Sequence, residues 1–380
     1  MSEKRLDLLY TEVEQELRAS VRSLLEDKSP PSAVLARVEG DQVTDTALWK
    51  ELAGIGVAGL PVPEELGGAG ASLRESAVVA EELGRSVAPV PFLGSAVLAT
   101  AALLEAGAGD DVAALASGEA VGALAVPLAT PPGAAFPEAV RAEDGALSGT
   151  VTGVVDAVAA DVLVVPAAGP EGPGLYVVEA AAARVTPVVT LDLTRPLAEV
   201  AFDGSAARRV ASGAAAQEAL RRALVTGAAL LSAEQLGVAE WALDTTVAYA
   251  KTRHQFGRPI GSFQAVKHRL ADLWVAISQA RAVVRSAASA AATARQDPGD
   301  AEAAREAEVN AALAQAFVSG VAVKAAEEAV QLHGGIGFTW EHPAHLFLKR
   351  AKSDSIALGT ADRHRLALGR LVDLPAAGSD

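Results

Sequence analysis

Two short blocks in the last third of the chain combine residue types that can bind a phosphate group. The first runs from Arg253 to Gly257 and the second from Gln331 to Gly335. An arginine offers paired N–H donors to phosphate oxygens, and two adjacent glycines let backbone N–H groups approach a pyrophosphate closely. Each feature alone has a plainer explanation, Arg253 as a surface charge and the glycine pair as a helix C-cap. Together the blocks predict a nucleotide site.

Other kinds of site are excluded by composition or spacing. The chain contains no cysteine, which excludes thiolate nucleophiles, disulfides and cysteine-based metal sites. His333, His342 and His345 do not have the tight i, i+4 spacing of a helical ligand pair, so we expect no metal ion. The formal net charge of −15 repels phosphate backbones and anionic headgroups, so we expect no nucleic-acid partner and no binding to anionic membranes.

The chain divides into three regions that must position these blocks. Residues 1–118 are predicted to form an all-helical domain, residues 119–208 a small β-domain, and residues 209–380 a second helical domain. This order predicts an α+β fold. The opening segment MSEKRLDLLYTEVEQEL is charged and amphipathic, unlike a signal peptide, and no apolar run reaches about 18 residues. We therefore expect a cytoplasmic protein with no membrane insertion.

Turn residues support this division. β-Branched runs at 162–165 and 175–178 are separated by the glycine- and proline-rich stretch 169–174, which predicts a β-hairpin. In the last region, apolar residues keep helical spacing over long stretches. The sequence Gln-Asp-Pro-Gly-Asp at 296–300 is expected to separate two of these helices.

The two phosphate-binding blocks resemble signature segments of the acyl-CoA dehydrogenase family. The first reads Tyr-Ala-Lys-Thr-Arg-His-Gln-Phe-Gly-Arg-Pro-Ile from residue 249, and the second reads Gln-Leu-His-Gly-Gly-Ile-Gly-Phe from residue 331. Weaker matches to the N-terminal domain of the family lie at 49–53 and 62–68. The resemblance spans nearly the whole chain and is strongest in the last third.

The resemblance implies an N-terminal helical domain, a middle β-barrel-like domain and a C-terminal four-helix bundle that forms the interface of a tetramer. It also implies FAD as the cofactor, an acyl-CoA thioester as the substrate and an electron-transferring flavoprotein as the electron acceptor. In the family, the residues matching Arg253 and Gln331 reach the FAD of the neighbouring subunit. Further positions matching FAD contacts are Gln255, Phe256, Gln264, Gly334, Gly335 and Thr360. Taken alone, Phe256 would instead be assigned to the core.

The catalytic base of the family is absent from both of its usual positions. The reaction removes an α-proton and transfers the β-hydride to the flavin, so it needs a carboxylate at the α-carbon. In most members this is a glutamate before a Gly-Thr pair, and Leu358 matches that position here. Other members place the base on an earlier helix, where Gly227 matches. Leucine and glycine cannot accept a proton, so no catalytic residue is assigned in this chain.

Flavin contacts of the middle domain are depleted as well. The Thr-Glu-Pro segment of the family survives at most at residues 130–132, and its Lys-x-Trp-Ile-Thr segment aligns with 151–155, which lacks the Trp and the hydroxyl donor. Other carboxylates do not replace the base, because each is expected to be solvated or to form a structural ion pair. Those considered are Glu234, Glu240, Asp272, Glu341 and Asp354.

The losses and the matches follow a pattern. In the family, the base and the middle-domain contacts belong to the subunit that holds the FAD, whereas the Arg253 and Gln331 contacts act across an interface. We therefore hypothesise that this chain is the base-lacking partner of a heteromeric acyl-CoA dehydrogenase, paired with a homologous subunit that carries the glutamate. Such members act on bulky CoA thioesters such as sterol side chains. Three alternatives are a self-sufficient homomeric dehydrogenase with a displaced base, a flavin-free scaffold and a flavin monooxygenase of similar fold.

Overall fold

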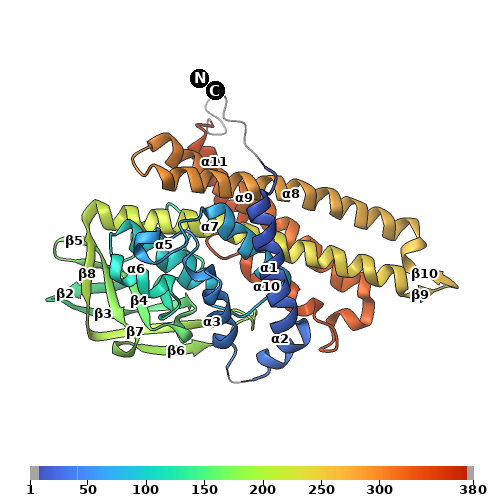
Figure 1. The fold of residues 1–380 in the computed structure, drawn as a ribbon, viewed down its shortest axis with the longest axis horizontal. Helices are drawn as coiled ribbons and strands as arrows, with labels where there is room; N and C mark the ends of the chain where they lie inside the picture. The colour runs from blue at the N-terminus through green and yellow to red at the C-terminus, as the bar shows by residue number, and fades with distance from the viewer. Residues whose placement is uncertain (1–7, 41, 375–380) are drawn as a thin grey trace.

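Helices cover one side of a mixed β-sheet, and a pair of long helices projects far beyond it (Figure 1). The computed structural model describes residues 8–40 and 42–374. The opening segment MSEKRLDLLYTEVEQEL lies partly outside the described residues. Within the described part, the first helix begins at Glu12. The order of elements confirms the predicted α+β fold.

Short helices make up the chain before the sheet. They are α1 (Glu12–Lys28), α2 (Pro31–Val38), α3 (Thr46–Gly54), η1 (Val57–Gly59), η2 (Glu64–Leu66), α4 (Leu73–Ser86), the π-helical η3 (Phe92–Ala99), α5 (Thr100–Glu105) and α6 (Gly109–Ala116). The start of α1 is a capping box, in which Thr11 Oγ1 accepts from the Glu14 N–H and Glu14 Oε2 accepts from the Thr11 N–H. This arrangement satisfies N–H groups that a helix start leaves without partners.

The sheet has the strand order β6-β7-β3-β2-β4-β5-β8, and β1 pairs in parallel with β4. Its strands are β1 (Gly122–Leu124), β2 (Val140–Glu143), β3 (Ala146–Val155), β4 (Val162–Gly169), β5 (Gly172–Glu179), β6 (Arg184–Val188), β7 (Leu197–Ala206) and β8 (Arg208–Ser212). Strands β4 and β5 are antiparallel with Gly169 opposite Gly172, which confirms the predicted hairpin. The turn is tighter than expected, because Pro173 and Gly174 already belong to β5.

Long helices follow the sheet. They are α7 (Gly213–Thr252), α8 (Gln264–Gln296) and α9 (Ala301–His333), followed by η7 (Gly334–Phe338), α10 (Ala344–Asp354) and α11 (Ala361–Leu371). The break between α8 and α9 lies where the sequence predicts it. The first strand of the sheet starts at Gly122 and the last ends at Ser212, while the division into domains at 118 and 208 stays a prediction.

One segment, Ala301–Phe338, is long and apolar enough by length and composition to cross a membrane. It comprises α9 and η7, and 61% of its most apolar window is buried inside the protein. Helix α9 packs against α7, α8 and α11, and its buried face is mostly alanine. Its apolar composition is therefore accounted for by its place in the bundle, since a helix buried by neighbours is apolar on several sides.

Small residues set how closely the helices approach. At the contact between α4 and α7, a Cβ on Gly237 would lie 1.9 Å from the Glu81 carbonyl oxygen, and one on Gly84 would lie 2.1 Å from that of Glu234. Glycine is required at both positions because the two backbones touch. The contact draws the N-terminal helices onto α7, and both belong to one hydrophobic core.

Candidate functional site

The first predicted block forms the tip of the projecting helix pair (Figure 1). Helix α7 ends at Thr252, and the strands β9 (His254–Gln255) and β10 (Arg258–Pro259) pair antiparallel before α8 returns. The turn between them has positive φ at Phe256 (53°) and at Gly257 (76°), the pattern of a type I′ turn. Phe256 is 91% exposed, so the alternative that assigns it to the core is wrong.

The second block lies next to the first. The rings of Tyr249 and His333 stack with their centroids 4.4 Å apart, which joins the last turn of α7 to the end of α9. Gly334 has φ 64° and caps α9, and its N–H donates to the Gln331 carbonyl. A Cβ placed on Gly334 or Gly335 would meet nothing within 4 Å. Gly334 is therefore a helix C-cap, which is the plainer of the two explanations given for the glycine pair. Both glycines also face open space.

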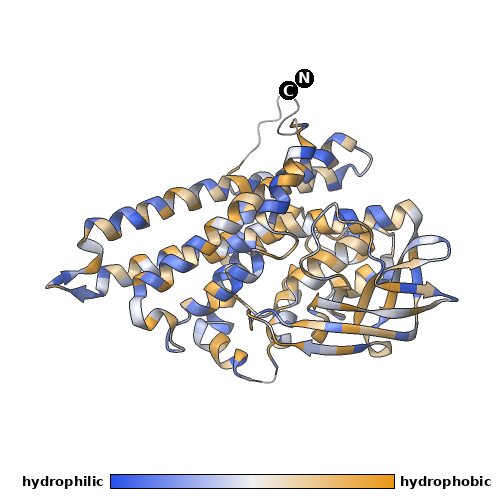
Figure 2. Ribbon diagram, turned by 180° about the vertical axis from the view of Figure 1, so that it is seen from behind, coloured by the Kyte–Doolittle hydropathy of each residue, from blue (hydrophilic) through white to orange (hydrophobic). Residues whose placement is uncertain are grey.

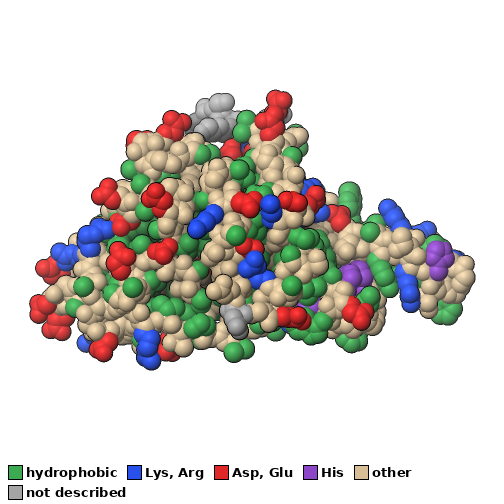
Figure 3. Space-filling model, turned by 60° about the horizontal axis from the view of Figure 1, so that its bottom comes forward, with side chains coloured by type: hydrophobic (Ala, Val, Ile, Leu, Met, Phe, Trp, Pro, Cys, Tyr) green, Lys and Arg blue, Asp and Glu red, His purple; other side chains and the backbone are tan. Residues whose placement is uncertain are grey.

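The tip is positively charged on a chain that is strongly acidic. Between Lys251 and Ala271 the sequence contains five Lys or Arg residues and no Asp or Glu. Figure 3 shows Lys and Arg side chains gathered on the projecting part, and Figure 2 shows its β-hairpin as hydrophilic. Arg253 is exposed, and no carboxylate in the described ranges lies within ion-pair distance of it. The tip can therefore attract and bind a phosphate-bearing group.

The tip residues fit the part of an FAD site that a neighbouring subunit supplies. Gln255, Gln264 and Gln331 are all exposed, as are Gly334 and Gly335. Amide side chains and open backbone N–H groups beside a guanidinium are suitable donors for a pyrophosphate. None of these groups is turned into the interior, so the ligand would have to lie between this tip and another surface.

Three histidines lie beneath the tip. The rings of His333 and His342 are 4.3 Å apart, and burial lowers the pKa of His342 to about 4. Burial also lowers the pKa of His333 and of His345. All three are therefore neutral at pH 7. Within residues 8–40 and 42–374, no group of three or more His, Cys, Asp or Glu side chains is arranged to hold a metal ion.

The two expected positions of the base meet in the interior. Leu358 is completely buried, and its Cδ1 lies 3.0 Å from where a Cβ on Gly227 would be. The Cδ2 of Leu98, from η3, lies 2.5 Å from the same point. Leu98 is a residue that sequence reasoning missed, because nothing in its local pattern reveals this distant contact. The place of the base is thus occupied by packed aliphatic side chains.

The segment around Leu358 is held firmly in place. Its N–H donates to the Leu128 carbonyl at 2.7 Å, and its carbonyl accepts from His364 Nε2 at 2.9 Å. Leu358 adopts φ 53°, a left-handed conformation that is strained for leucine. A Cβ on Gly359 would lie 2.8 Å from Cβ of Pro131, so this segment contacts residues 128–131. Thr360 is exposed and precedes the first residue of α11.

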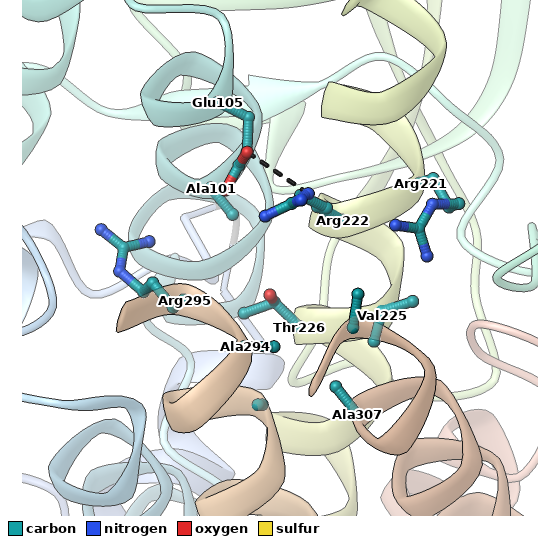
Figure 4. A pocket seen from close by; sticks show the side chains of 11 residues that line it. Ala101, Glu105, Arg221, Arg222, Val225, Thr226, Ala294, Arg295 and Ala307 are labelled. Atoms are coloured by element: carbon teal, nitrogen blue, oxygen red, sulfur yellow. Dashed lines mark ion pairs between the residues drawn. The ribbon is translucent and has the colours of Figure 1, made fainter. Parts of the chain in front are cut away.

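A small pocket of about 40 Å³ lies among α5, α7, α8 and α9, with alanines and several charged side chains in its lining (Figure 4). Thr226, the neighbour of Gly227, lines it. Arg222 and Glu105 form an ion pair at 3.5 Å along its wall, and Arg295 enters it from α8. An alkyl chain that entered this pocket would cover these charged groups with apolar carbon. Burying charges in this way costs free energy.

The carboxyl groups nearest Leu358 and Gly227 are bonded to arginines. Glu234, two turns along α7 from Gly227, is paired with Arg195 and Arg350. Asp354, one turn before Leu358, is paired with Arg195 at 2.6 Å. Both are buried and bonded to arginines, so neither is solvated, and Glu234 forms a structural ion pair as predicted.

Comparisons with known proteins agree on one family. The acyl-CoA dehydrogenase N-terminal domain model matches residues 11–111, and the C-terminal domain model matches residues 212–372. Acyl-CoA dehydrogenase IpdE2 of Mycobacterium tuberculosis is 40% identical over 343 residues, which cover 90% of this chain and 91% of that protein.

Solved structures of similar fold include members of paired enzymes. The ChsE4–ChsE5 complex from Mycobacterium tuberculosis contains a chain with a TM-score of 0.84 and 30% identity, covering 98% of this chain and 100% of that one. A steroid acyl-CoA dehydrogenase variant, Tcur3481–Tcur3483, gives a TM-score of 0.81 and 31% identity, covering 95% and 98%. With matching domains at both ends and a relative of 40% identity along nearly its full length, this chain belongs to the acyl-CoA dehydrogenase family.

Proposed function

We propose that this chain is the base-lacking subunit of a heteromeric acyl-CoA dehydrogenase. A homologous companion subunit supplies the catalytic glutamate and most of the flavin contacts, and this chain completes the companion's FAD site with Arg253, Gln331 and the Gly334–Gly335 pair. The observation that carries the proposal is that Leu358 and Leu98 both pack at Gly227, so that aliphatic side chains and no carboxylate stand at the two positions of the base.

The exposed tip supports the second half of the proposal. Its donors face outward on a cationic projection, which is the arrangement needed to reach a cofactor bound by another chain. The exposed Phe256 and the half-exposed Trp274 and Trp340 offer aromatic contacts of the kind that are enriched at protein interfaces. In this proposal the assembly is a tetramer built from both kinds of chain.

The relatives support the choice of substrate class. One similar structure is a complex of two named chains, and another is a steroid acyl-CoA dehydrogenase. The proposed substrate is therefore a bulky CoA thioester such as one carrying a sterol side chain, with an electron-transferring flavoprotein as electron acceptor. When bound, FAD supplies the hydride acceptor, and this chain contributes binding and orientation of its nucleotide part.

Flavin content tests the proposal. The chain is purified alone and after co-expression with a glutamate-bearing homologue, and FAD per chain and its bleaching by acyl-CoAs are measured. Little FAD alone and full FAD with bleaching in the complex are expected. Stoichiometric FAD that bleaches in the isolated chain would instead establish a self-sufficient enzyme. A colourless protein that never binds a companion would establish a scaffold.

Arg253→Ala in the co-expressed complex is expected to weaken FAD binding about 10- to 100-fold, because a charge-assisted hydrogen bond is lost. The melting temperature of the isolated chain is expected to stay unchanged, since Arg253 is exposed and has no ion-pair partner among the described residues. FAD affinity is measured by flavin fluorescence during dilution. Lys267→Ala, an exposed cation on the first turn of α8, is the matched control. Equal losses for both variants would show a general charge effect and remove Arg253 from the site.

A further inference from the structure

A fully buried group of charges joins the sheet to α7 and α10. It contains the arginines Arg195 and Arg350 and the acids Asp156, Asp192, Glu234 and Asp354, all of them buried. Arg350 donates to Asp192 Oδ2 and to Glu234 Oε1, each at 2.6 Å. Arg195 donates to Asp354 Oδ1 at 2.6 Å and is also paired with Glu234. We call these six residues the buried clasp.

The clasp has more acids than bases. Its two guanidinium groups carry two positive charges, and four ionised carboxylates would carry four negative charges. A net charge of −2 in the interior is costly, because burial removes the hydration that stabilises ions in water. The direct pairs support a negative charge on Asp192 and Glu234, which accept the two hydrogen bonds that Arg350 donates to carboxylates. Asp192 also accepts from the Thr194 hydroxyl.

The two remaining acids have weaker support for a negative charge. Asp354 accepts from Arg195 through Oδ1, but its Oδ2 is buried and has no hydrogen-bond partner among the described residues. Asp156 accepts one bond, from the Gly94 N–H at 2.8 Å. A cavity of about 10 Å³ between Asp156 and the two arginines is at the lower limit for one water molecule, so bulk solvent does not neutralise these groups.

Several elements pack around the clasp. The loop after β6 contributes Asp192, Thr194 and Arg195, the end of β3 contributes Asp156, α7 contributes Glu234, and α10 contributes Arg350 and Asp354. The N-terminal helices contribute the Gly94 N–H and apolar side chains to the cavity wall.

We infer that the buried clasp is a proton-dependent lock, in which Asp354 holds a proton at neutral pH and release of that proton at alkaline pH loosens the Leu358 segment from residues 128–131. Asp354 ends α10, only four residues before Leu358, so a change at Asp354 acts directly on that segment. The inference does not depend on FAD or on the proposed companion subunit.

The direction of the pH effect follows from the two acids whose pKa is raised in the folded chain. Burial raises the pKa of Asp354 to about 8 and that of Asp156 to about 6, against an ordinary value near 3.8. Between these ordinary and folded values the folded chain binds more protons than the unfolded chain, so stability falls as pH rises. For one proton the unfolding equilibrium changes by up to about tenfold per pH unit.

Asp354→Asn tests the lock, because asparagine resembles the protonated acid in size and keeps an oxygen for Arg195. Unfolding of the native chain and of the variant is measured from pH 6 to pH 9. The two are expected to be similar in stability at pH 6, and the variant is expected to be the more stable at pH 9. Burial also raises the pKa of Glu81, to about 7, so the difference between native chain and variant is the quantity compared. Asp362→Asn, at an exposed surface pair, should leave the pH dependence unchanged.

Two further measurements do not depend on the stability of one variant. The native chain at pH 6 should show a stronger infrared carbonyl band of buried protonated carboxyl groups than the Asp354→Asn variant, since Asp156 and Glu81 contribute to the band in both. The amide of Leu358, bonded to Leu128, should exchange faster in the native chain than in the variant at pH 9. A variant that is less stable than the native chain by the same amount at pH 6 and pH 9, with no difference in the carbonyl band, would overturn the inference and make Asp354 an ordinary ionised partner of Arg195.

Discussion

Leu358→Glu is expected to lower the free energy of unfolding by about 3–5 kcal/mol at pH 8, the cost of an unpaired charge in the interior. The new carboxylate would face Leu98 and Gly227 in the buried interior. Since burial raises the pKa of a carboxyl, the loss should be smaller at pH 5, where the group is neutral. Denaturant unfolding at both pH values measures it.

Two controls separate charge from size and from position. Leu358→Gln has nearly the same volume without the charge, and its loss should not depend on pH. Leu366→Glu, at a position 67% exposed on α11, should change stability by less than about 0.5 kcal/mol. If Leu358→Glu instead kept native stability and made the isolated chain bleach a bound flavin with acyl-CoA, this chain would hold a complete site that lacks only its base.

Gly237→Ala is expected to destabilise the chain by about 3 kcal/mol, because the added methyl would overlap the backbone of α4. Its Cβ would lie 1.9 Å from the Glu81 carbonyl oxygen and 2.9 Å from the Arg85 nitrogen. Backbone atoms cannot rotate away as a side chain can, so the two helices would have to separate. Thermal and denaturant unfolding of the isolated chain measure the loss.

Gly320→Ala is the matched control within α9. A Cβ there would meet nothing within 4 Å, and alanine is favoured over glycine inside a helix by about 0.5–1 kcal/mol. This variant should therefore be slightly more stable than the native chain. Equal destabilisation by both substitutions would show that the α4–α7 contact is not the close approach described here.

Sequence patterns alone predicted the order of helices and strands, the break between α8 and α9 and the hairpin of β4 and β5. These features depend on local periodicity and on turn residues, which act within a few positions along the chain. The blocks at Arg253 and at Gln331 were also recognisable, because their residue types and order are distinctive. The absence of a carboxylate at 358 and 227 needed only the identity of those residues.

Contacts between distant residues could not be read from the sequence. The packing of Leu98 on Gly227 and Leu358 joins three segments, and no local pattern distinguishes Leu98 from any other leucine of a buried helix. The sequence did not decide whether Phe256 is exposed either. An aromatic residue is expected in the core unless a turn with positive φ directs it outward. The buried clasp was missed for a related reason, since each of its charges looks like an ordinary surface residue in isolation.

The sequence by itself thus determined the family, the class of fold and the absence of a carboxylate at residues 358 and 227, because these are recorded in residue identity and in short-range order. Only the tertiary structure decided that aliphatic side chains meet at Gly227 and Leu358, that the residues of the two blocks face outward, and that four acids are buried with two arginines. Those outcomes depend on which side chains meet once the helices and the sheet have packed, and on the burial that sets the energy of each charge.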